Sequence, residues 1–302
     1  MTIAVALVAS ATLTRAADNR VLVIGIDGCR SDALQSANTP NIDALVENGI
    51  WFDGTDIRSP DRTDAANTVS GPGWSNLLTG VWPDKHGIID NKFETPHYDA
   101  FPHFFQRIKE VRPDAFTASF STWPPIAKII TRSADVVENF PAGDPKDLDG
   151  YIAGDVEATA ACVQCLKEKD PTCVFLYLGQ VDETGHKYGF HPSVPQYTKA
   201  IETVDRHLGD VQSQLGRRSA EKKENWLTIV CTDHGGAGTD HGGGHDNPEI
   251  RRTFLIVSGP SAQHGRSEAQ TWQVDVVPTI LRHLNINAKP GWKLDGHPVG
   301  LK

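Results

Sequence analysis

The chain has 302 residues, of which 39% are hydrophobic and 22% are charged, and its formal net charge is −9 at pH 7. This is ordinary globular composition, and the length suits one large α/β domain with a sizeable core. The acidity and the lack of a basic run argue against nucleic-acid binding through phosphate neutralisation, and no apolar stretch approaches the length of a membrane-spanning helix.

The N-terminus predicts an exported protein. Residues 3–13 form a run of apolar or small residues, which is followed by Ala16 and Ala17. This pattern resembles a secretory signal, so we expect a secreted or periplasmic protein that is cleaved near Ala17, with residues 18–302 as a single domain. The positive charges that usually begin such a signal are missing, so a short buried strand or a disordered lead is the alternative.

Apolar runs and helical patterns alternate along the rest of the chain. In chain order we expect a strand over 21–28, a helix around 41–48, a helix over 101–110, a strand over 116–121, a helix over 148–169, a strand over 172–178, a helix over 194–215, strands over 226–231 and 254–257, and a helix over 274–284. This alternation predicts an α/β fold with a mostly parallel central sheet and helices on both faces. Residues 92–147 are irregular and rich in Pro, Phe and Trp, which predicts either a lid or subdomain over the site or a surface insertion.

Acidic and imidazole side chains follow three of the expected strands. They are Asp27 at the end of 21–28, Asp182 and His186 after 172–178, and Asp233, His234 and His241 after 226–231. Because ligands of such sheets bind at the carboxyl ends of the strands, we expect these side chains to converge at one edge. Together with the hydroxyl of Ser70 they suffice for two metal ions that share a nucleophile, which favours an enzyme over a binding module.

Ser70 begins a helix-like segment, Ser-Gly-Pro-Gly-Trp-Ser-Asn-Leu-Leu. A serine hydroxyl is a poor nucleophile at neutral pH, but coordination to a divalent cation lowers its pKa and orients it. Backbone N–H groups at a helix start can also hold an oxyanion. Asn91, which ends the same stretch, can donate its amide N–H to a non-bridging oxygen on which charge develops.

Five motifs occur together in a fixed order. They are Gly-Ile-Asp-Gly-Cys-Arg-Ser-Asp at 25–32, the block 70–91, Val-Asp-Glu-Thr-Gly-His at 181–186, Cys-Thr-Asp-His-Gly-Gly at 231–236, and Asp-Val-Val-Pro-Thr-Ile-Leu at 275–281. In this order they resemble the alkaline phosphatase superfamily, specifically its type I phosphodiesterase/nucleotide pyrophosphatase family. One such motif would be a weak signal, whereas five in order are strong. The resemblance implies a three-layer fold like that of alkaline phosphatase and hydrolysis of a small phosphate ester.

The resemblance also implies a role for each site residue. The metal ion that activates the nucleophile is expected on Asp27, Ser70, Asp233 and His234, and the second metal ion on Asp182, His186 and His241. We expect both ions to be zinc, Ser70 to form a phosphoseryl intermediate, and Asn91 to hold non-bridging oxygens. His245, on the same Gly-rich loop, is the alternative to His241 as the late histidine.

Three other functions compete with a phosphodiesterase. A phosphomonoesterase or a sulfatase of the same superfamily would share much of the pattern. Sulfatases carry their nucleophile in C/S-x-P-x-R, and here Ser70 and Pro72 match this motif whereas Trp74 replaces the arginine. The imidazoles also suit zinc better than the oxygen-rich calcium site of sulfatases. A catalytically dead scaffold would have lost a ligand or the nucleophile, and none is missing. No motif names the leaving group.

Overall fold

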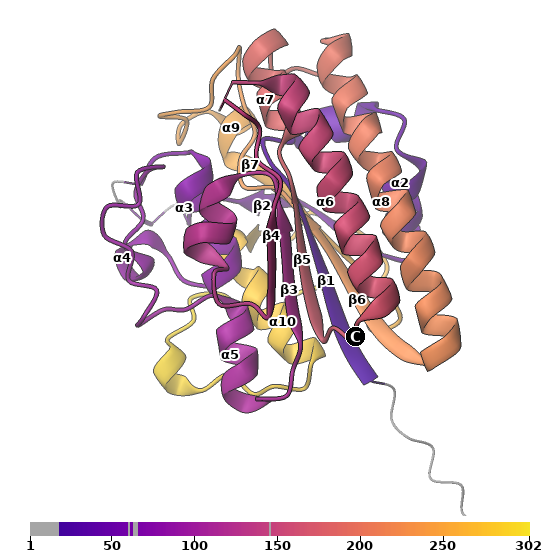
Figure 1. Ribbon diagram of the computed structural model, residues 1–302. Helices are drawn as coiled ribbons and strands as arrows, with labels where there is room; N and C mark the ends of the chain where they lie inside the picture. Colours follow the sequence, from indigo (N-terminus) through magenta and orange to yellow (C-terminus); the bar gives the residue numbers. More distant parts are fainter. Residues whose placement is uncertain (1–17, 60, 63–65, 145) are drawn as a thin grey trace, which may run out of the picture.

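The computed structural model describes residues 18–59, 61–62, 66–144 and 146–302, and the expected signal segment 1–17 lies outside them. Helices cover both faces of a central sheet, which confirms the predicted fold class (Figure 1). The strands are β1 (Asp18–Ile26), β2 (Gly49–Asp56), β3 (Thr117–Ser121), β4 (Val136–Asn139), β5 (Cys173–Leu178), β6 (Glu224–Cys231), β7 (Arg252–Ser258), β8 (Gly265–Ser267) and β9 (Thr271–Trp272). The described strands form one sheet in the order β4-β3-β5-β1-β6-β7-β2-β8, and β9 pairs with β2.

Most neighbouring strands run parallel. β1 lies between β5 and β6 and is parallel to both, and β3 is parallel to β4 and β5. β7 is the exception, since it runs antiparallel to both β6 and β2. Residues 20–26 of β1 are all buried, as expected for a parallel strand with helices on both faces.

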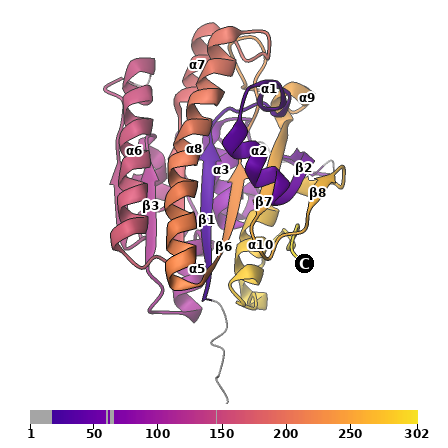
Figure 2. The same ribbon diagram turned by 90° about the vertical axis from the view of Figure 1, so that its right-hand side faces the viewer.

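The helices form the two outer layers. They are α1 (Ser31–Ser36), α2 (Pro40–Glu47), α3 (Ser70–Thr79), α4 (Pro83–His86), α5 (Phe104–Val111), a π-helix (Ile126–Ile130), α6 (Leu148–Glu168), α7 (Gln180–Tyr188), α8 (Pro195–Lys222), α9 (Pro248–Arg251) and α10 (Val276–His283), with 3-10 turns over Gln273–Asp275 and Pro290–Trp292. α3, α5 and α10 cover one face, and α2, α6 and α8 cover the other (Figures 1 and 2). Side chains of β1 alternate between the two cores, with Val21 and Val23 in one and Leu22 and Ile24 in the other.

The structure adds several elements that the sequence patterns did not predict, among them β2, β4 and α7. β2 contains a short apolar run and then an irregular half, with a register shift between Phe52 and Thr55. β4 is the outermost strand on its side of the sheet and is only partly buried. Segment 92–147 therefore contributes α5, the π-helix and two strands of the sheet, β3 and β4.

α8 continues seven residues beyond the expected end, to Lys222. This last part is polar, so its hydrophobic period is lost, but Arg218 within it is buried. The Arg218 guanidinium donates to Glu224 and to the backbone oxygens of Leu166 and Lys169, which tie α8 to the end of α6. Within the described part of the chain, no helix combines the length and the apolar character needed to cross a lipid bilayer.

The strand order places the candidate site. Because β5, β1 and β6 are adjacent and parallel, the residues that follow them meet at one edge of the sheet. Gly28 allows the close approach there. Its φ of +63° favours glycine, and a Cβ on it would lie 2.4 Å from Oδ1 of Asp182.

Candidate metal centre

Asp27 lies at the centre of the candidate site and is 1% exposed. Its Oδ2 accepts hydrogen bonds from Trp74 Nε1 at 2.9 Å and from the Tyr177 hydroxyl at 2.5 Å. Its Oδ1 lies 3.5 Å from Ser70 Oγ and 3.5 Å from His234 Nε2. One oxygen is thus held by protein donors, while the other faces the predicted nucleophile and an imidazole.

Ser70 occupies the first position of α3 and is buried. Its Oγ lies 3.4 Å from His234 Nε2, so the hydroxyl, that imidazole and Asp27 converge on one point. Asn91 accepts a hydrogen bond from the backbone N–H of Gly71 at 2.6 Å through its carbonyl oxygen. This contact uses the oxygen of the side chain. The Asn91 Nδ2 group has no hydrogen-bond partner within the described residues and is available to a ligand.

Asp233 follows β6 and turns its two oxygens toward different neighbours. Oδ1 accepts from the backbone N–H of Gly28 at 3.2 Å. Oδ2 is buried, lies 3.2 Å from His234 Nε2, and has no hydrogen-bond donor among the described residues. A buried carboxylate oxygen without a donor is costly, and this observation fits a cation at that position.

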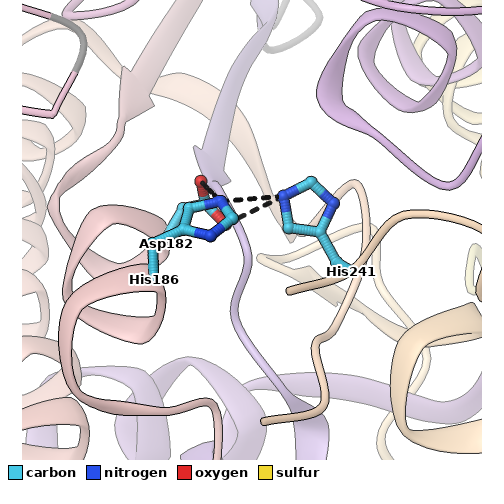
Figure 3. Close-up of side chains that lie close together, drawn as sticks. All are labelled: Asp182, His186 and His241. Atoms are coloured by element: carbon cyan, nitrogen blue, oxygen red, sulfur yellow. Dashed lines mark hydrogen bonds and ion pairs between the residues drawn. The ribbon is translucent and has the colours of Figure 1, made fainter. Parts of the chain in front are cut away.

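The second group of side chains comes from α7 and the loop after β6 (Figure 3). His186 Nε2 lies 3.3 Å from Asp182 Oδ2 and 3.0 Å from His241 Nε2. His241 Nε2 in turn lies 3.7 Å from Asp182 Oδ1, which is buried and has no hydrogen-bond donor among the described residues. The possible ligand atoms of Asp182, His186 and His241 lie within 4.8 Å of one another. The possible ligand atoms of Asp27, Asp182 and His234 form a second group with the same spacing. Asp182 thus lies between the two groups.

All three site histidines turn Nδ1 toward a backbone oxygen. The pairs are His186 with Thr239 at 2.9 Å, His234 with Gly235 at 2.8 Å and His241 with Thr68 at 2.9 Å. An Nδ1–H that donates to a carbonyl leaves Nε2 as a lone pair, which is the usual arrangement of a metal-binding histidine. The Nε2 lone pairs of the three histidines then face carboxylate oxygens or each other. Cations between these atoms would remove the repulsion between the lone pairs and the carboxylates. The donor set therefore fits divalent metal ions.

Burial and mutual repulsion shift the pKa values of the carboxyl groups. Burial, with a contribution from the nearby Asp182, raises the pKa of Asp27 to about 7, and burial raises that of Asp233 well above its usual range. For Asp182, burial acts in the same direction, but His241 and His186 outweigh it and lower the pKa to about 2. The protein without metal thus favours protons on some of these groups, and divalent cations would take their place.

His186 shows how a proton can substitute for such a cation. Burial alone would lower its pKa, but the contact with Asp182 raises it to about 9. Burial and the nearby His234 instead lower the pKa of His241 to about 4. At neutral pH and without metal, His186 is therefore charged and His241 is neutral, so His186 can donate a hydrogen bond across the Nε2–Nε2 contact between the two rings.

The structure places His245 away from both groups. Its Nε2 lies 2.7 Å from the backbone oxygen of Ala66, whereas His241 lies against Asp182 and His186. Sequence reasoning missed Tyr177 and Thr68 as partners of the site. Tyr177 is one more apolar-looking residue of a buried strand. Thr68 contacts His241 through its backbone oxygen and through its hydroxyl, which donates to the backbone oxygen of His241, but a single threonine in a loop carries no sequence signal. Trp74, the other donor to Asp27, did stand out in the sequence, because it occupies the position where sulfatases have arginine.

Residues 21–253 match the family model for type I phosphodiesterase / nucleotide pyrophosphatase. The chain belongs to this family. It is 25% identical over 245 residues to human ectonucleotide pyrophosphatase/phosphodiesterase family member 7. The matched region covers 74% of this chain and 49% of the human protein. The chain is 22% identical over 231 residues to bovine bis(5'-adenosyl)-triphosphatase ENPP4, covering 72% and 47% of the two chains. The chain spans about half the length of these family relatives.

Solved structures share the fold. Murine ectonucleotide pyrophosphatase/phosphodiesterase 5 superposes with a TM-score of 0.63 at 18% identity, covering 90% of this chain and 96% of that chain. A 2-O GAG sulfatase superposes with a TM-score of 0.73 at 14% identity, covering 93% and 73%. At these identities the likeness concerns the fold alone, and sulfatases and phosphodiesterases share it.

Proposed function

We propose that this chain is a two-metal hydrolase of phosphate esters, acting as a phosphodiesterase or nucleotide pyrophosphatase with Ser70 as its nucleophile. The observation that carries this proposal is the convergence of Ser70 Oγ, Asp27 Oδ1 and His234 Nε2 within 3.5 Å contacts. Three histidine Nε2 atoms directed at buried carboxylates support two cations there. Family membership supports the reaction class.

The residues divide into two ligand sets. Asp27, Ser70, Asp233 and His234 would hold one ion, and Asp182, His186 and His241 the other. When bound, the two ions, which we propose to be zinc, lower the pKa of a hydroxyl and offset charge on oxygens of the reacting phosphate. Asp182 lies close to both sets, so its charge would serve both cations.

The reaction proceeds in two displacements at phosphorus. Ser70 gives up its hydroxyl proton to solvent and its Oγ forms a bond to phosphorus, while the bond from phosphorus to the leaving oxygen breaks and that oxygen takes a proton from solvent, which gives a phosphoseryl intermediate. Water then attacks the same phosphorus and loses a proton, the bond to Ser70 breaks, and Ser70 Oγ takes up a proton. Asn91 donates its free amide N–H to a non-bridging oxygen in both steps. Its carbonyl is anchored on Gly71, so the amide is oriented before substrate binds.

The charge of the site favours diesters over monoesters. No hydrogen bond or ion pair of Ser70, Asn91 or the ligand candidates in the described chain involves a lysine or an arginine. A monoester dianion carries more negative charge than a diester, and it would meet three buried aspartates with only the metal ions to offset it. An inactive form of the murine structural relative was solved in complex with AMP, which supports nucleotides as a substrate class.

We also propose that the protein acts outside the cytoplasm, in the periplasm or as a secreted protein. The signal-like N-terminus and the names of the relatives as ectonucleotide enzymes support this placement.

The test compares wild type with Ser70→Ala on three substrates, bis-p-nitrophenyl phosphate, p-nitrophenyl phosphate and p-nitrophenyl sulfate, alongside metal analysis. We expect wild type to carry zinc and to prefer the diester, and Ser70→Ala to lose roughly 1,000-fold or more in kcat. Ser75→Ala, on the same helix but bonded to Tyr98, is the control and should keep most of the activity.

Each other result changes a specific part of the proposal. The mechanism is refuted if the protein contains no transition metal and its Ser70→Ala variant hydrolyses the esters as fast as wild type. A dominant rate on the sulfate ester would make the protein a sulfatase. A dominant rate on p-nitrophenyl phosphate would make it a phosphomonoesterase and overturn the charge argument.

A further inference from the structure

Helix α7 carries Asp182 and His186, and it begins at once after β5. The residue before it, Gly179, is the N-cap and has no side chain to accept the unpaired N–H groups of the first turn. Asp155 of α6 instead accepts from two backbone N–H groups at this helix start. Its Oδ1 accepts from Gly179 N at 2.9 Å, and its Oδ2 accepts from Gln180 N at 3.1 Å.

Two more donors complete the surroundings of Asp155. Gln180 Nε2 donates to Oδ2 at 3.0 Å, and Thr122 Oγ1, just after β3, donates to Oδ1 at 3.0 Å. Asp155 is 0% exposed, so water does not compete for these bonds. With two donors on each oxygen, the carboxylate fixes both the position and the direction of the first turn of α7.

We propose that Asp155 is a positioning residue for the metal centre. By holding the start of α7, it sets where Asp182 and His186 lie relative to Asp27 and His241. This inference rests on the proposed function, because it concerns the ion assigned to Asp182, His186 and His241. Metal sites need their ligands held to within about 0.5 Å, so a loosened helix start weakens that ion even though Asp155 does not touch it.

The hydrogen bonds near the C-terminal end of α7 go to a loop. Beyond its last residue, Phe190 N donates to Gly238 O at 2.7 Å, and His186 contacts Thr239 O. Both partners belong to the Gly-rich loop that also carries His241. The C-terminal part of α7 is therefore tied to a loop, whereas Asp155 ties its N-terminal part to the helix layer and the sheet.

The chain contains a matched control for this role. Asp205 of α8 is 1% exposed and caps α2 from outside in the same way. It accepts from Asn41 N at 3.0 Å, Ile42 N at 2.8 Å and Asn41 Nδ2 at 2.8 Å. The chemistry is that of Asp155, but α2 carries no candidate ligand. Asp205→Asn therefore weakens a buried cap of α2 and changes no candidate metal ligand or its helix.

The experiment measures zinc binding to the metal-free protein by competition with a chromophoric chelator, for wild type, Asp155→Asn and Asp205→Asn. We expect both variants to lose thermal stability. Asp155→Asn should bind one of its two zinc ions roughly 10- to 100-fold more weakly, whereas Asp205→Asn should bind both within about twofold of wild type. Thr122→Val removes a single bond to Asp155 and should shift the same ion by a smaller factor, which keeps the test open if Asp155→Asn does not fold.

Hydrogen exchange on the metal-free proteins gives a second readout that needs no ion. Asp155→Asn should speed exchange in α7, and Asp205→Asn should speed it in α2. If Asp155→Asn destabilises the protein but binds both zinc ions as wild type does, Asp155 is a structural cap only and the inference is wrong. If wild type binds no zinc, the proposed function fails. In that case, if hydrogen exchange in α7 of Asp155→Asn is the same as in wild type, the positioning role is wrong as well. If exchange in α7 is faster, Asp155 still positions α7.

Discussion

The two oxygens of Asp27 receive different partners, and this division is the residue-scale basis of the site. Tyr177 and Trp74 both donate to Oδ2, which leaves Oδ1 directed at Ser70 and His234. The two donors come from β5 and α3, so the orientation of one carboxylate depends on packing between a strand and a helix. Donors of this kind tune a ligand although they never touch the metal.

Tyr177→Phe tests this support. The variant leaves the fully buried Oδ2 with a single donor, so we expect the ion assigned to Asp27 to bind about 10- to 100-fold more weakly and the rate of phosphoenzyme formation to fall. Zinc titration and rapid-quench kinetics measure the two effects. Tyr98→Phe is the control, since it removes a buried hydroxyl bonded to Ser75. It should lower stability by about 1 kcal/mol and leave zinc binding unchanged. Equal zinc affinities for Tyr177→Phe and wild type would show that the Trp74 bond suffices.

The late histidine is the second residue-scale prediction. His241 Nε2 faces His186 and Asp182, whereas His245 bonds the backbone oxygen of Ala66. We expect His241→Ala to lose one zinc ion and several orders of magnitude in activity, because it would remove a proposed direct ligand. His245→Ala should keep both ions. Metal analysis after desalting, with activity on the diester, measures both. A zinc-poor, inactive His245→Ala beside an active, fully loaded His241→Ala would reverse the assignment.

At the scale of elements, α3 presses directly on the turn that follows β6. A Cβ on Gly73 would lie 2.8 Å from Asp233 Cβ and 2.9 Å from its backbone oxygen, so glycine is what lets the helix approach. Ser70 is one turn earlier on the same helix. The distance between the proposed nucleophile Ser70 and the proposed ligand Asp233 thus depends on how closely α3 packs here.

Gly73→Ala should therefore push α3 away from Asp233. We expect a loss of about 1–3 kcal/mol in the free energy of unfolding and a drop in kcat of roughly 100-fold, since displacements of about 1 Å at a reacting group can cost this much. Urea unfolding and steady-state kinetics on the diester report the two effects. The matched control is Gly216→Ala in α8, where a Cβ meets nothing within 4 Å. This substitution should stabilise the protein by about 0.5–1 kcal/mol and leave kcat unchanged. Wild-type kcat in Gly73→Ala would mean that the helix contact does not set the geometry of Ser70.

At the scale of the whole molecule, buried neutral histidines make the fold sensitive to acid. Burial lowers the pKa of His86 from 6.5 to about 3, and burial does the same for His103. His86 Nε2 donates to Asn76 Oδ1 while its Nδ1 accepts from the N–H of Ile88, so both ring nitrogens are used only in the neutral form. Their stabilising contribution is complete above the unfolded pKa of 6.5 and is lost as the pH falls toward 3.

This predicts a loss of about 2 kcal/mol per histidine in the free energy of unfolding between pH 7 and pH 5. Urea unfolding at pH 7, 6 and 5 with a chelator present separates this loss from acid release of metal. His86→Gln cannot titrate, so we expect it to be less stable than wild type at pH 7 and to lose about 2 kcal/mol less on going to pH 5. A wild-type dependence on pH in this variant would contradict the prediction.

The sequence alone determined the layers, most of the helices and strands, and the residues that follow β1, β5 and β6. Continuous apolar runs such as 21–28 identify buried parallel strands, and the ends of such strands are where ligands collect. The convergence of Asp27, Asp182 and Asp233 at one edge of the sheet could therefore be predicted from the sequence. β2 and β4 were not, because neither carries a strong period. The reversed direction of β7 was equally hidden, since pairing direction depends on neighbours that are distant in the chain.

Only the tertiary structure decided how the proposed ligands are held. Tyr177 and Asp27 are separated by 150 positions and His241 and Thr68 by 173, and no local pattern links such pairs. The cap that Asp155 provides for α7 is of the same kind, because Gly179 itself reveals only that a cap is missing. Local sequence specifies which groups are chemically able to act, through their type and their element. The orientation of each group depends on hydrogen bonds that form after the layers have packed.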